Sequence, residues 1–217
     1  MNALLSTTYF GPVQWYQKLH RSEVVYLEQH ENFIKQTYRN RCVIATTNGL
    51  QVLTVPVEHA EGNNGLDSRN IASLHISDHN NWRRVHWNAL MTAYGESPFF
   101  DYYADDLRPF FEKKWETLFE FNLDITRKMC ELLDIHPDIR LTGSYRSTKV
   151  VEEENCEALI ASLVDYREAI RPKHPLPDND FSSKPYYQVY APKQGFFPNL
   201  SILDLLFNMG NEAIFYL

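Results

Sequence analysis

Residues 1–57 alternate between short apolar runs and turn residues, which predicts a small β-rich unit at the start of the chain. Residues 3–9 and 23–27 are apolar enough for two buried strands, and residues 13–20 place apolar side chains at helical spacing between them. A strand, a short helix and a second strand in succession predict a βαβ unit, in which the two strands are parallel.

A strand pair follows at residues 41–46 and 50–57. The two runs flank Asn48-Gly49, and Asn-Gly between apolar runs is a strong hairpin signal because both residues tolerate positive φ. Pro56 has no amide hydrogen to donate and should end its strand at a sheet edge. Together with the βαβ unit, this hairpin predicts a small mixed sheet.

Helical spacing dominates the rest of the chain. Apolar side chains recur every three to four residues over 80–94, 118–132 and 152–169, and each of these segments is predicted to be a helix. Residues 139–151 look extended. Residues 171–185 hold four prolines and mixed charges, so we expect an irregular loop there.

The last helix is short and apolar nearly all round, so it should be buried. Ser201 and Asp204 have the spacing of a capping box at its start, and Gly210 should end it. The predicted fold class is therefore α/β, as one domain over 1–217. A small mixed sheet comes first, and a mainly helical C-terminal half follows it.

Composition narrows the class of protein. The 217 residues include 28 acidic and 21 basic ones, a formal charge of −7, which argues against a general nucleic-acid binder. The cysteines are odd in number and far apart, which fits a reducing compartment. The start of the chain lacks the pattern of a signal peptide, and no apolar run is long enough to span a membrane. We expect a cytoplasmic protein with no membrane span.

The sequence lacks the common catalytic signatures. It has no P-loop, no dinucleotide-binding glycine motif, no nucleophile elbow and no zinc-protease motif. His75 and His79 are four residues apart, but Asp78 between them looks like a strand end passing into a helix cap, which would separate the two rings. We therefore predict no metal site and no cofactor.

One short stretch is strongly cationic. Lys35, Arg39 and Arg41 lie close together, interleaved with Tyr38 and Asn40, just ahead of the predicted hairpin. Arginine binds phosphate and carboxylate through two parallel hydrogen bonds, so the cluster suits an anionic ligand. The alternative is a solvated strand end, where cations prevent pairing with another chain.

Two further residue types suit catalysis. His86 follows Trp82 on the predicted helix, and its near-neutral pKa fits a general acid or base, although a structural histidine is the alternative. Asp101 lies beside Tyr102 and Tyr103. Carboxylates next to aromatic rings are typical of sugar sites, whereas an acidic helix start is the competing interpretation.

These elements in this order resemble the WbqC-like family, and the likeness extends over roughly residues 3–135. The order and spacing of the motifs carry it, and the tail from Gln194 to Asn208 resembles the branch of the family found in Bacteroidetes. The matching residues are Tyr9, Pro12, Trp15 and Tyr16, then Asn32, Phe33 and Lys35, Tyr38-Arg39-Asn40-Arg41, Asn48-Gly49, Leu53 to Val57, Trp82-Arg83-Arg84 with His86, and Tyr94 with Pro98-Phe99-Phe100 and Tyr103.

The resemblance implies a role in the assembly of bacterial surface polysaccharides. The implied reaction is transfer of an acyl or aminoacyl group to an amino sugar carried on a nucleotide, and the alternative is a non-catalytic ligand-binding or scaffold protein of such a pathway. The expected partner is a phosphate-bearing small molecule such as a nucleotide-sugar. We predict His86 and Asp101 as catalytic residues, and Lys35, Tyr38, Arg39, Asn40, Arg41 and Tyr94 as ligand-binding residues.

The chain departs from the family pattern at two places. Many members open with a Gln-Pro pair where this chain has Thr7-Thr8, and many carry paired aspartates after the second strand, where this chain has Glu28 and Glu31. If those aspartates are catalytic in relatives, the two glutamates substitute for them or the activity differs. The loop over 171–185 either closes over the ligand as a lid or is a plain surface connection.

Overall fold

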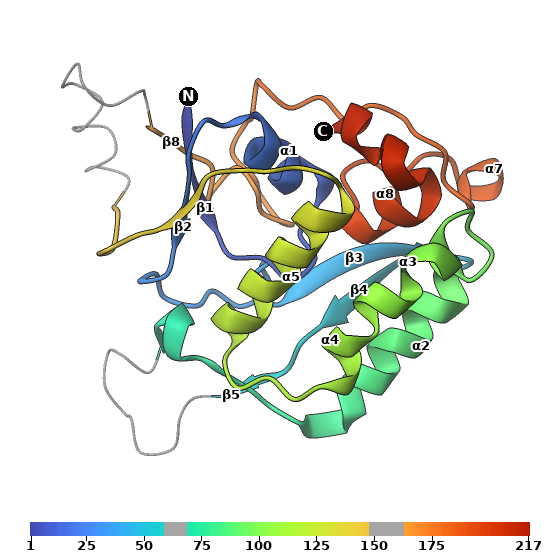
Figure 1. The fold of residues 1–217 in the computed structure, drawn as a ribbon, viewed down its shortest axis with the longest axis horizontal. Coiled ribbons are helices and arrows are strands. Elements are labelled where there is room, and N and C mark those ends of the chain that lie inside the picture. The colour runs from blue at the N-terminus through green and yellow to red at the C-terminus, as the bar shows by residue number, and fades with distance from the viewer. Residues whose placement is uncertain (59–68, 148–162) are drawn as a thin grey trace.

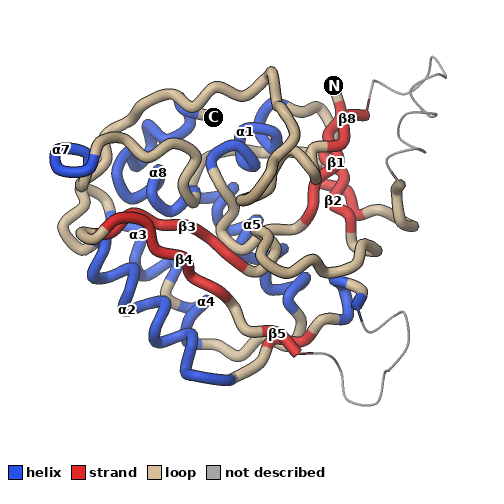
Figure 2. The backbone as a smooth tube through the Cα atoms, turned by 180° about the vertical axis from the view of Figure 1, so that it is seen from behind, coloured by secondary structure: helices blue, strands red, loops and turns tan. Residues whose placement is uncertain are grey.

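The computed structural model describes residues 1–58, 69–147 and 163–217. A four-stranded sheet lies at one end of the molecule, a hairpin runs through the middle, and most helices lie towards the other end (Figures 1 and 2). The α/β class is confirmed, with helices concentrated in the C-terminal half.

The four-stranded sheet is parallel throughout. Its spatial order is β7 (Ile139–Leu141), β2 (Val25–Glu28), β1 (Asn2–Ser6) and β8 (Leu163–Asp165). Helix α1 (Val13–Arg21) connects β1 to β2, so the predicted βαβ unit is confirmed. Parallel strands joined through a helix bury both faces of the sheet, which agrees with the apolar character of the first two strands.

The strand order reverses direction once, between β1 and β8. From β1 the sheet grows through β2 to β7 on one side, and the chain then returns to add β8 on the other side of β1. In open parallel sheets such a reversal creates a crevice at the carboxyl ends of the strands, because the connections on its two sides leave in opposite directions. The topology therefore marks one place on this sheet as the favoured ligand site.

The remaining elements cover the hairpin and the sheet. Strands β3 and β4 form the predicted antiparallel hairpin, which is a separate sheet, and β5 pairs with β6. The strands are β3 (Arg41–Thr46), β4 (Gly49–Thr54), β5 (Val57–Glu58) and β6 (His75–Ile76); the α-helices are α2 (Trp82–Tyr94), α3 (Phe100–Leu107), α4 (Pro109–Glu112), α5 (Leu118–Leu132), α7 (Ala191–Gln194) and α8 (Ile202–Met209); the 3₁₀ helices are η2 (Ile71–Ser73), η3 (His79–Asn81) and η4 (Gly210–Tyr216).

Local sequence signals explain where these elements begin and end. Gly95 follows α2, and Gly49 closes the hairpin turn with a φ of +103°, a conformation that glycine adopts without strain. The Thr117 hydroxyl caps α5, and the Ser201 hydroxyl caps α8 by accepting a hydrogen bond from the backbone of Leu203. Helix α8 is buried, as its apolar sequence predicts.

The prediction of a helix over 152–169 is wrong for residues 163–169, the part of this segment that the structure describes. Residues 163–165 form strand β8, paired in parallel with β1, and the residues after it form no helix. Leu163 and Tyr166 have helical spacing, but pairing with a buried central strand satisfies their backbone better than an isolated helical turn would. The rest of that segment lies outside the described residues. Of the extended region expected over 139–151, residues 148–151 lie outside the described residues, and within 139–147 only β7 is a strand.

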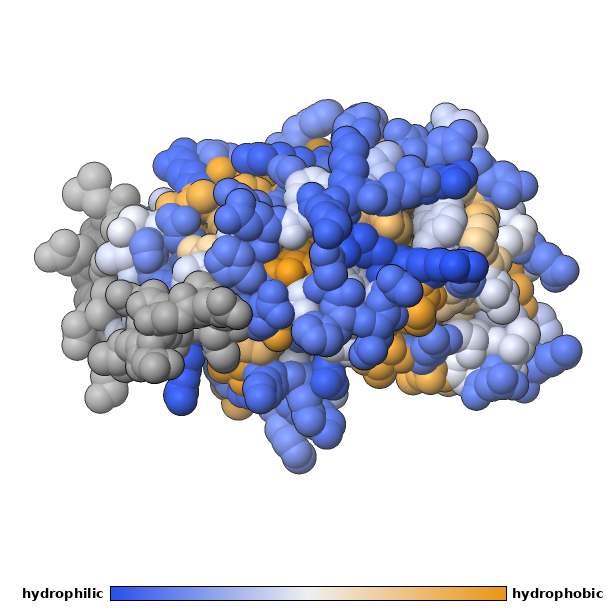
Figure 3. Space-filling view, turned by 90° about the horizontal axis from the view of Figure 1, so that it is seen from below, coloured by the Kyte–Doolittle hydropathy of each residue, from blue (hydrophilic) through white to orange (hydrophobic). Residues whose placement is uncertain are grey.

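The core is continuous from the sheet to the far helices and rich in aromatic rings. Tyr9 and Phe10 follow β1 and are fully buried, and Phe10 stacks on Phe111 with ring centroids 6.0 Å apart. Hydrophilic residues cover most of the face that carries α2 and β5, with apolar residues between them (Figure 3). Within the described ranges, no helix is long and apolar enough to cross a membrane.

Candidate functional site

The carboxyl ends of the parallel strands carry polar and charged side chains. Ser6 ends β1, Glu28 ends β2 and Asp165 ends β8, while Thr142 directly follows β7. Because all four strands run the same way, these side chains gather at one edge of the sheet. This edge is also where the strand order reverses, so the topology and the residue types indicate the same place.

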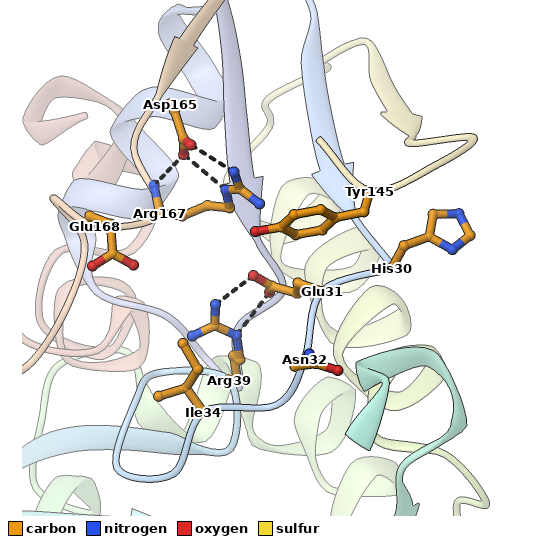
Figure 4. A pocket seen from close by; sticks show the side chains of 9 residues that line it. All are labelled: His30, Glu31, Asn32, Ile34, Arg39, Tyr145, Asp165, Arg167 and Glu168. Atoms are coloured by element: carbon orange, nitrogen blue, oxygen red, sulfur yellow. Dashed lines mark hydrogen bonds and ion pairs between the residues drawn. The ribbon is translucent and has the colours of Figure 1, made fainter. Parts of the chain in front are cut away.

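A pocket of about 300 Å³ opens at this edge. Figure 4 shows its charged side chains in two tiers, with the Arg167–Asp165 pair on one side and the Glu31–Arg39 pair on the other. The hydroxyl of Tyr145 points into the space between the two pairs. The lining residues are His30, Glu31, Asn32, Ile34, Arg39, Tyr145, Asp165, Arg167 and Glu168.

Arg39 and Glu31 form a buried, bidentate ion pair on one wall. Arg39 Nε donates to Glu31 Oε1 at 2.8 Å, and Arg39 Nη2 donates to Glu31 Oε2 at 2.5 Å. Ser6 Oγ accepts a further hydrogen bond from Arg39 Nη2 at 2.9 Å and donates to Glu31 at 3.1 Å. This network fixes both charged groups against the end of β1, so their positions do not depend on a bound ligand.

Glu28 lies beneath the pocket and is fully buried. Its carboxylate accepts hydrogen bonds from the backbone nitrogen of His30 at 2.7 Å, from Thr142 Oγ1 at 2.8 Å and from the backbone nitrogen of Arg146 at 2.8 Å. Arg167 Nη1 lies 3.8 Å from the same carboxylate. A buried carboxylate with three donors and a cation nearby is compensated for the loss of water, and it ties β2, β7 and β8 together.

Arg167 forms the second wall. It donates to both carboxylate oxygens of Asp165, at 2.9 Å from Nε and 2.7 Å from Nη2, and Nη2 also donates to the carbonyl of Arg146 at 2.6 Å. Burial lowers the pKa of the Arg167 guanidinium, but the hydrogen bonds and charge of Asp165 outweigh burial, so the pKa is raised and the group stays charged. Its guanidinium carbon lies 5.5 Å from the centre of the Tyr145 ring.

The buried charges of this site do not cancel. Among the buried side chains of the described residues, Glu28, Glu31 and Asp165 supply three carboxylates and Arg39 and Arg167 supply two guanidinium groups, so the carboxylates outnumber the cations by one. Because the side chains of these groups are largely shielded from solvent, such an excess attracts a cationic group. The buried part of the pocket therefore favours an ammonium group over a phosphate.

Several groups in the pocket remain available to a ligand. Among the described residues, Arg39 Nη1 and the Tyr145 hydroxyl have no hydrogen-bond partner, and both belong to lining residues. His30 lies at the rim beside Tyr145, and its Nε2 is 3.1 Å from the carbonyl oxygen of Thr142. A carbonyl only accepts, so Nε2 carries the proton in the neutral ring, and Nδ1 has a free lone pair that can accept a proton.

The structure places only one of the predicted cationic residues in this pocket. Arg39 lines it, whereas Lys35 is exposed next to the lining residue Ile34. Tyr38 is half-buried, and Asn40 is buried with its amide donating to the carbonyl of Val55 at 2.8 Å. Arg41 is half-buried at the start of β3, away from the pocket lining.

The other predicted site residues lie elsewhere. His86 is buried in the core with Nδ1 2.8 Å from the Tyr9 hydroxyl, and burial lowers its pKa to about 4. Tyr94 is fully buried and donates to Asp204 at 2.8 Å, while Asp101 is exposed in the first turn of α3. The structure does not bring these three together with Arg39. The catalytic roles of His86 and Asp101 stay predictions.

Several residues that line the pocket are absent from the predicted set of site residues. The sequence predicts no role for Tyr145 and Glu168. It places Asp165 and Arg167 in a predicted helix and at the base of the loop over 171–185, where Arg167 adds positive charge near the expected anion site. The signal was present at strand ends: charged residues directly follow the apolar residues of β2 and β8. Glu28 and Glu31 were singled out only as departures from the family pattern, and the structure places one under the pocket and the other in its wall.

The irregular loop over 171–185 forms no helix or strand, as expected. Its middle is fixed to α1, because Asp178 accepts hydrogen bonds from Lys18 Nζ at 2.9 Å and from Gln14 Nε2 at 2.8 Å. Lys173 Nζ donates to Gln36 Oε1 at 3.2 Å, next to the exposed Lys35. The start of the loop therefore lies beside the pocket rim and adds positive charge there.

Metal ligands do not gather in the described parts of the chain. No group of three or more His, Cys, Asp or Glu side chains there has the arrangement that holds a metal ion. His79 is occupied by a hydrogen bond between its Nδ1 and the hydroxyl of Ser77.

Fold and site together define a parallel α/β protein with a polar, charged pocket at the carboxyl edge of its sheet. The chain belongs to the WbqC-like protein family, whose model matches residues 7–216. It is also 30% identical over 204 residues to the uncharacterized protein Rv1507c of Mycobacterium tuberculosis, a match that covers 85% of this chain and 83% of the relative. No solved structure gives a significant match. The likeness of the tail to a Bacteroidetes branch stays a prediction.

Proposed function

We propose that this protein transfers an acyl or aminoacyl group to an amino sugar carried on a nucleotide, a reaction of surface-polysaccharide assembly. The observation that carries the proposal is the excess of carboxylates over guanidinium groups among the described buried residues of the pocket, at the point where the strand order reverses. A nucleotide-linked amino sugar combines an amine, which suits this interior, with a diphosphate, which suits a cationic rim.

The two ends of such a substrate match two parts of the site. The amine lies against the carboxylates of Glu31 and Glu168, which line the pocket and pair with Arg39 and Arg171 in its absence. The diphosphate lies at the rim, near Lys35 and Lys173 and within reach of Arg39 Nη1. Charge-assisted hydrogen bonds contribute about 1.5–3 kcal/mol each, so a few of them suffice for micromolar binding.

The reaction needs a proton acceptor, because an ammonium group is not a nucleophile. In our proposal His30 Nδ1 takes a proton from the ammonium, directly or through one water molecule. The free amine nitrogen attacks the carbonyl carbon of an activated acyl ester or thioester, forming the amide bond. The attacking nitrogen releases its second proton to solvent, the bond to the carrier then breaks, and the carrier leaves with the proton from His30.

A matched pair of ligands tests the amine subsite. UDP-glucosamine carries an amine where UDP-N-acetylglucosamine carries a neutral amide, and the two are otherwise alike. Calorimetry should show at least tenfold tighter binding of UDP-glucosamine, and Glu168→Gln should reduce that preference. Glu112→Gln, at an exposed position outside the pocket, is the matched control. Equal affinity for both ligands would contradict the proposed amine subsite.

A second experiment separates catalysis from binding. Mass spectrometry of mixtures of the protein, UDP-glucosamine and an acyl thioester should detect the N-acylated product, and His30→Gln should slow its formation while leaving UDP-glucosamine binding within about twofold.

The competing function is a non-catalytic binding protein of the same pathway. The mutual satisfaction of Glu31, Arg39 and Ser6 favours that alternative, because a network complete without ligand can be structural. Binding without product across a series of acyl donors would support it.

A further inference from the structure

A second groove lies between the hairpin and helix α2, at the other end of the molecule from the parallel sheet (Figure 1). Its volume is about 340 Å³, comparable to that of the charged pocket. The hairpin turn forms one wall and one face of α2 forms the other. The lining residues are Thr46, Thr47, Asn48, Gln51, Val85, Asn88, Ala89, Thr92, Ala93 and Tyr190.

The lining of this groove carries no charge. Charged residues make up 23% of the chain, yet the described residues that line the groove are three amides, three threonines, a tyrosine and small aliphatic residues. A solvated surface of this protein would normally include Lys, Glu or Asp. The chemistry therefore differs in kind from that of the charged pocket, and it disfavours phosphate and carboxylate ligands.

The polar groups of the groove are available. Within the described part of the chain, the side-chain amides of Asn48, Gln51 and Asn88 make no hydrogen bond, and neither do the hydroxyls of Thr47 and Thr92. They come from both walls and converge on the same hollow. An amide both donates and accepts, as a sugar hydroxyl does, so each can pair with a hydroxyl in either direction.

An aromatic ring is fixed at the side of the groove. The Tyr190 hydroxyl donates to the carbonyl of Ala93 at 2.6 Å, which holds the ring against the C-terminal end of α2. Val85, Ala89 and Ala93 recur at intervals of four along the helix and form an apolar floor. An aromatic ring with an apolar floor suits the C–H face of a sugar.

Both walls are held in place without a ligand. Gln194 Nε2 donates to the carbonyls of Thr46 and Thr47 at 2.9 and 2.8 Å, which clamps the hairpin turn. The hydroxyl of Tyr94 accepts a hydrogen bond from the backbone nitrogen of Ala45 at 3.2 Å, which fixes the hairpin to α2. A preformed groove avoids much of the entropic cost of binding.

We propose that this groove is a binding site for an uncharged sugar, distinct from the charged pocket. The uncharged lining disfavours anionic ligands, the free amides and hydroxyls pair with sugar hydroxyls, and Tyr190 packs on the sugar ring. The site does not require the charged pocket to be an enzyme, because none of its residues lies there.

The test is an NMR titration of the full chain with neutral oligosaccharides of glucose, mannose, galactose and N-acetylglucosamine at millimolar concentrations. At least one should shift the amide resonances of the hairpin turn and of α2 from Val85 to Ala93. Anionic galacturonate oligomers and cationic glucosamine oligomers should bind more weakly. Since a neutral hydrogen bond contributes about 1 kcal/mol, Asn88→Ala and Gln51→Ala should each weaken binding about fivefold.

Two controls keep the result specific. Met91→Ala changes an exposed residue of α2 outside the groove and should leave sugar affinity unchanged. Glu168→Gln, in the charged pocket, should also leave it unchanged, which separates this site from the proposed function. Failure of the whole neutral series to bind would overturn the proposal. So would tighter binding of the charged oligomers, or equal affinity of the native chain and the Asn88 and Gln51 variants.

Discussion

Replacing Arg39 with alanine tests whether the pocket wall is held by its ion pair. The side chains of Arg39 and Glu31 are only 5% and 6% exposed, so water does little to screen the pair. Arg39→Ala leaves the carboxylate of Glu31 buried with Ser6 as its remaining hydrogen-bond donor. Breaking a buried pair by removing one partner costs about 3–5 kcal/mol. For a chain of this size, that corresponds to a fall in Tm of about 6–20 °C.

The double variant Glu31→Leu/Arg39→Met separates the ion pair from the burial of an unpaired charge. Replacing both members of a buried pair by apolar residues of similar size is often close to neutral for stability. We therefore expect the double variant to recover most of the Tm that Arg39→Ala loses, while still failing to bind UDP-glucosamine. Differential scanning calorimetry and binding calorimetry on the same samples measure the two effects.

Arg140→Ala supplies the control, because it breaks an exposed pair with Asp138 and should leave the Tm nearly unchanged. If Arg39→Ala changes the Tm no more than Arg140→Ala does, the pair does not hold the wall as described. If the double variant is no more stable than Arg39→Ala, the cost does not come from the unpaired carboxylate of Glu31.

Three further predictions follow from buried groups. Burial lowers the pKa of His86 to about 4, so NMR should find its ring neutral at pH 5. The stability that the neutral ring contributes should fall as the pH drops from about 6.5 to about 4. Burial raises the pKa of Asp204 to about 6. The contribution of Asp204 to the free energy of unfolding should therefore fall by about 3 kcal/mol as the pH rises from about 4 to about 6. In thermal melts, Asp204→Asn should abolish this pH dependence. Asp178→Ala leaves Lys18 buried without its carboxylate partner, which should lower the free energy of unfolding by about 3 kcal/mol and speed proteolysis of the loop over 171–185. Asp180→Ala, at an exposed position in the same loop, should change neither stability nor proteolysis.

Much of the fold could be predicted because its signals are local. The turn at Asn48-Gly49, the glycine after α2 and the serine before α8 act within a few residues of themselves, and each structure forms where the sequence indicates. Strand β8 is different. It is three residues long, and only pairing with β1, from the other end of the chain, makes it a strand. No local pattern carries that information.

The site could be predicted only in part, for the same reason. Arg39 was found because arginine beside tyrosine and asparagine is a chemical signal in itself. Its role depends on Ser6, which ends β1, and on Glu31, which follows β2. It also depends on the opposite wall, where Asp165 ends β8 and Arg167 follows that strand. A pattern read along the chain grouped Arg39 with Lys35 and Arg41, whereas the fold groups it with carboxylates. The fold thus places Arg39 in a pocket of mixed charge, and binding of an anion there stays a prediction.

Glu28, which ends β2, and Glu31, which follows it, lie in different surroundings. Glu28 is fully buried and its carboxylate already accepts three hydrogen bonds, so it has little capacity left for a ligand. Glu31 lies in the pocket wall, where a ligand can reach it. Where relatives carry paired aspartates at these positions, the shorter side chains would withdraw the second carboxylate from Arg39 and widen the pocket. Glu31→Asp should therefore weaken the bidentate pair with Arg39 while keeping the negative charge. This substitution would show whether the length of the Glu31 side chain adjusts the pocket to a particular substrate.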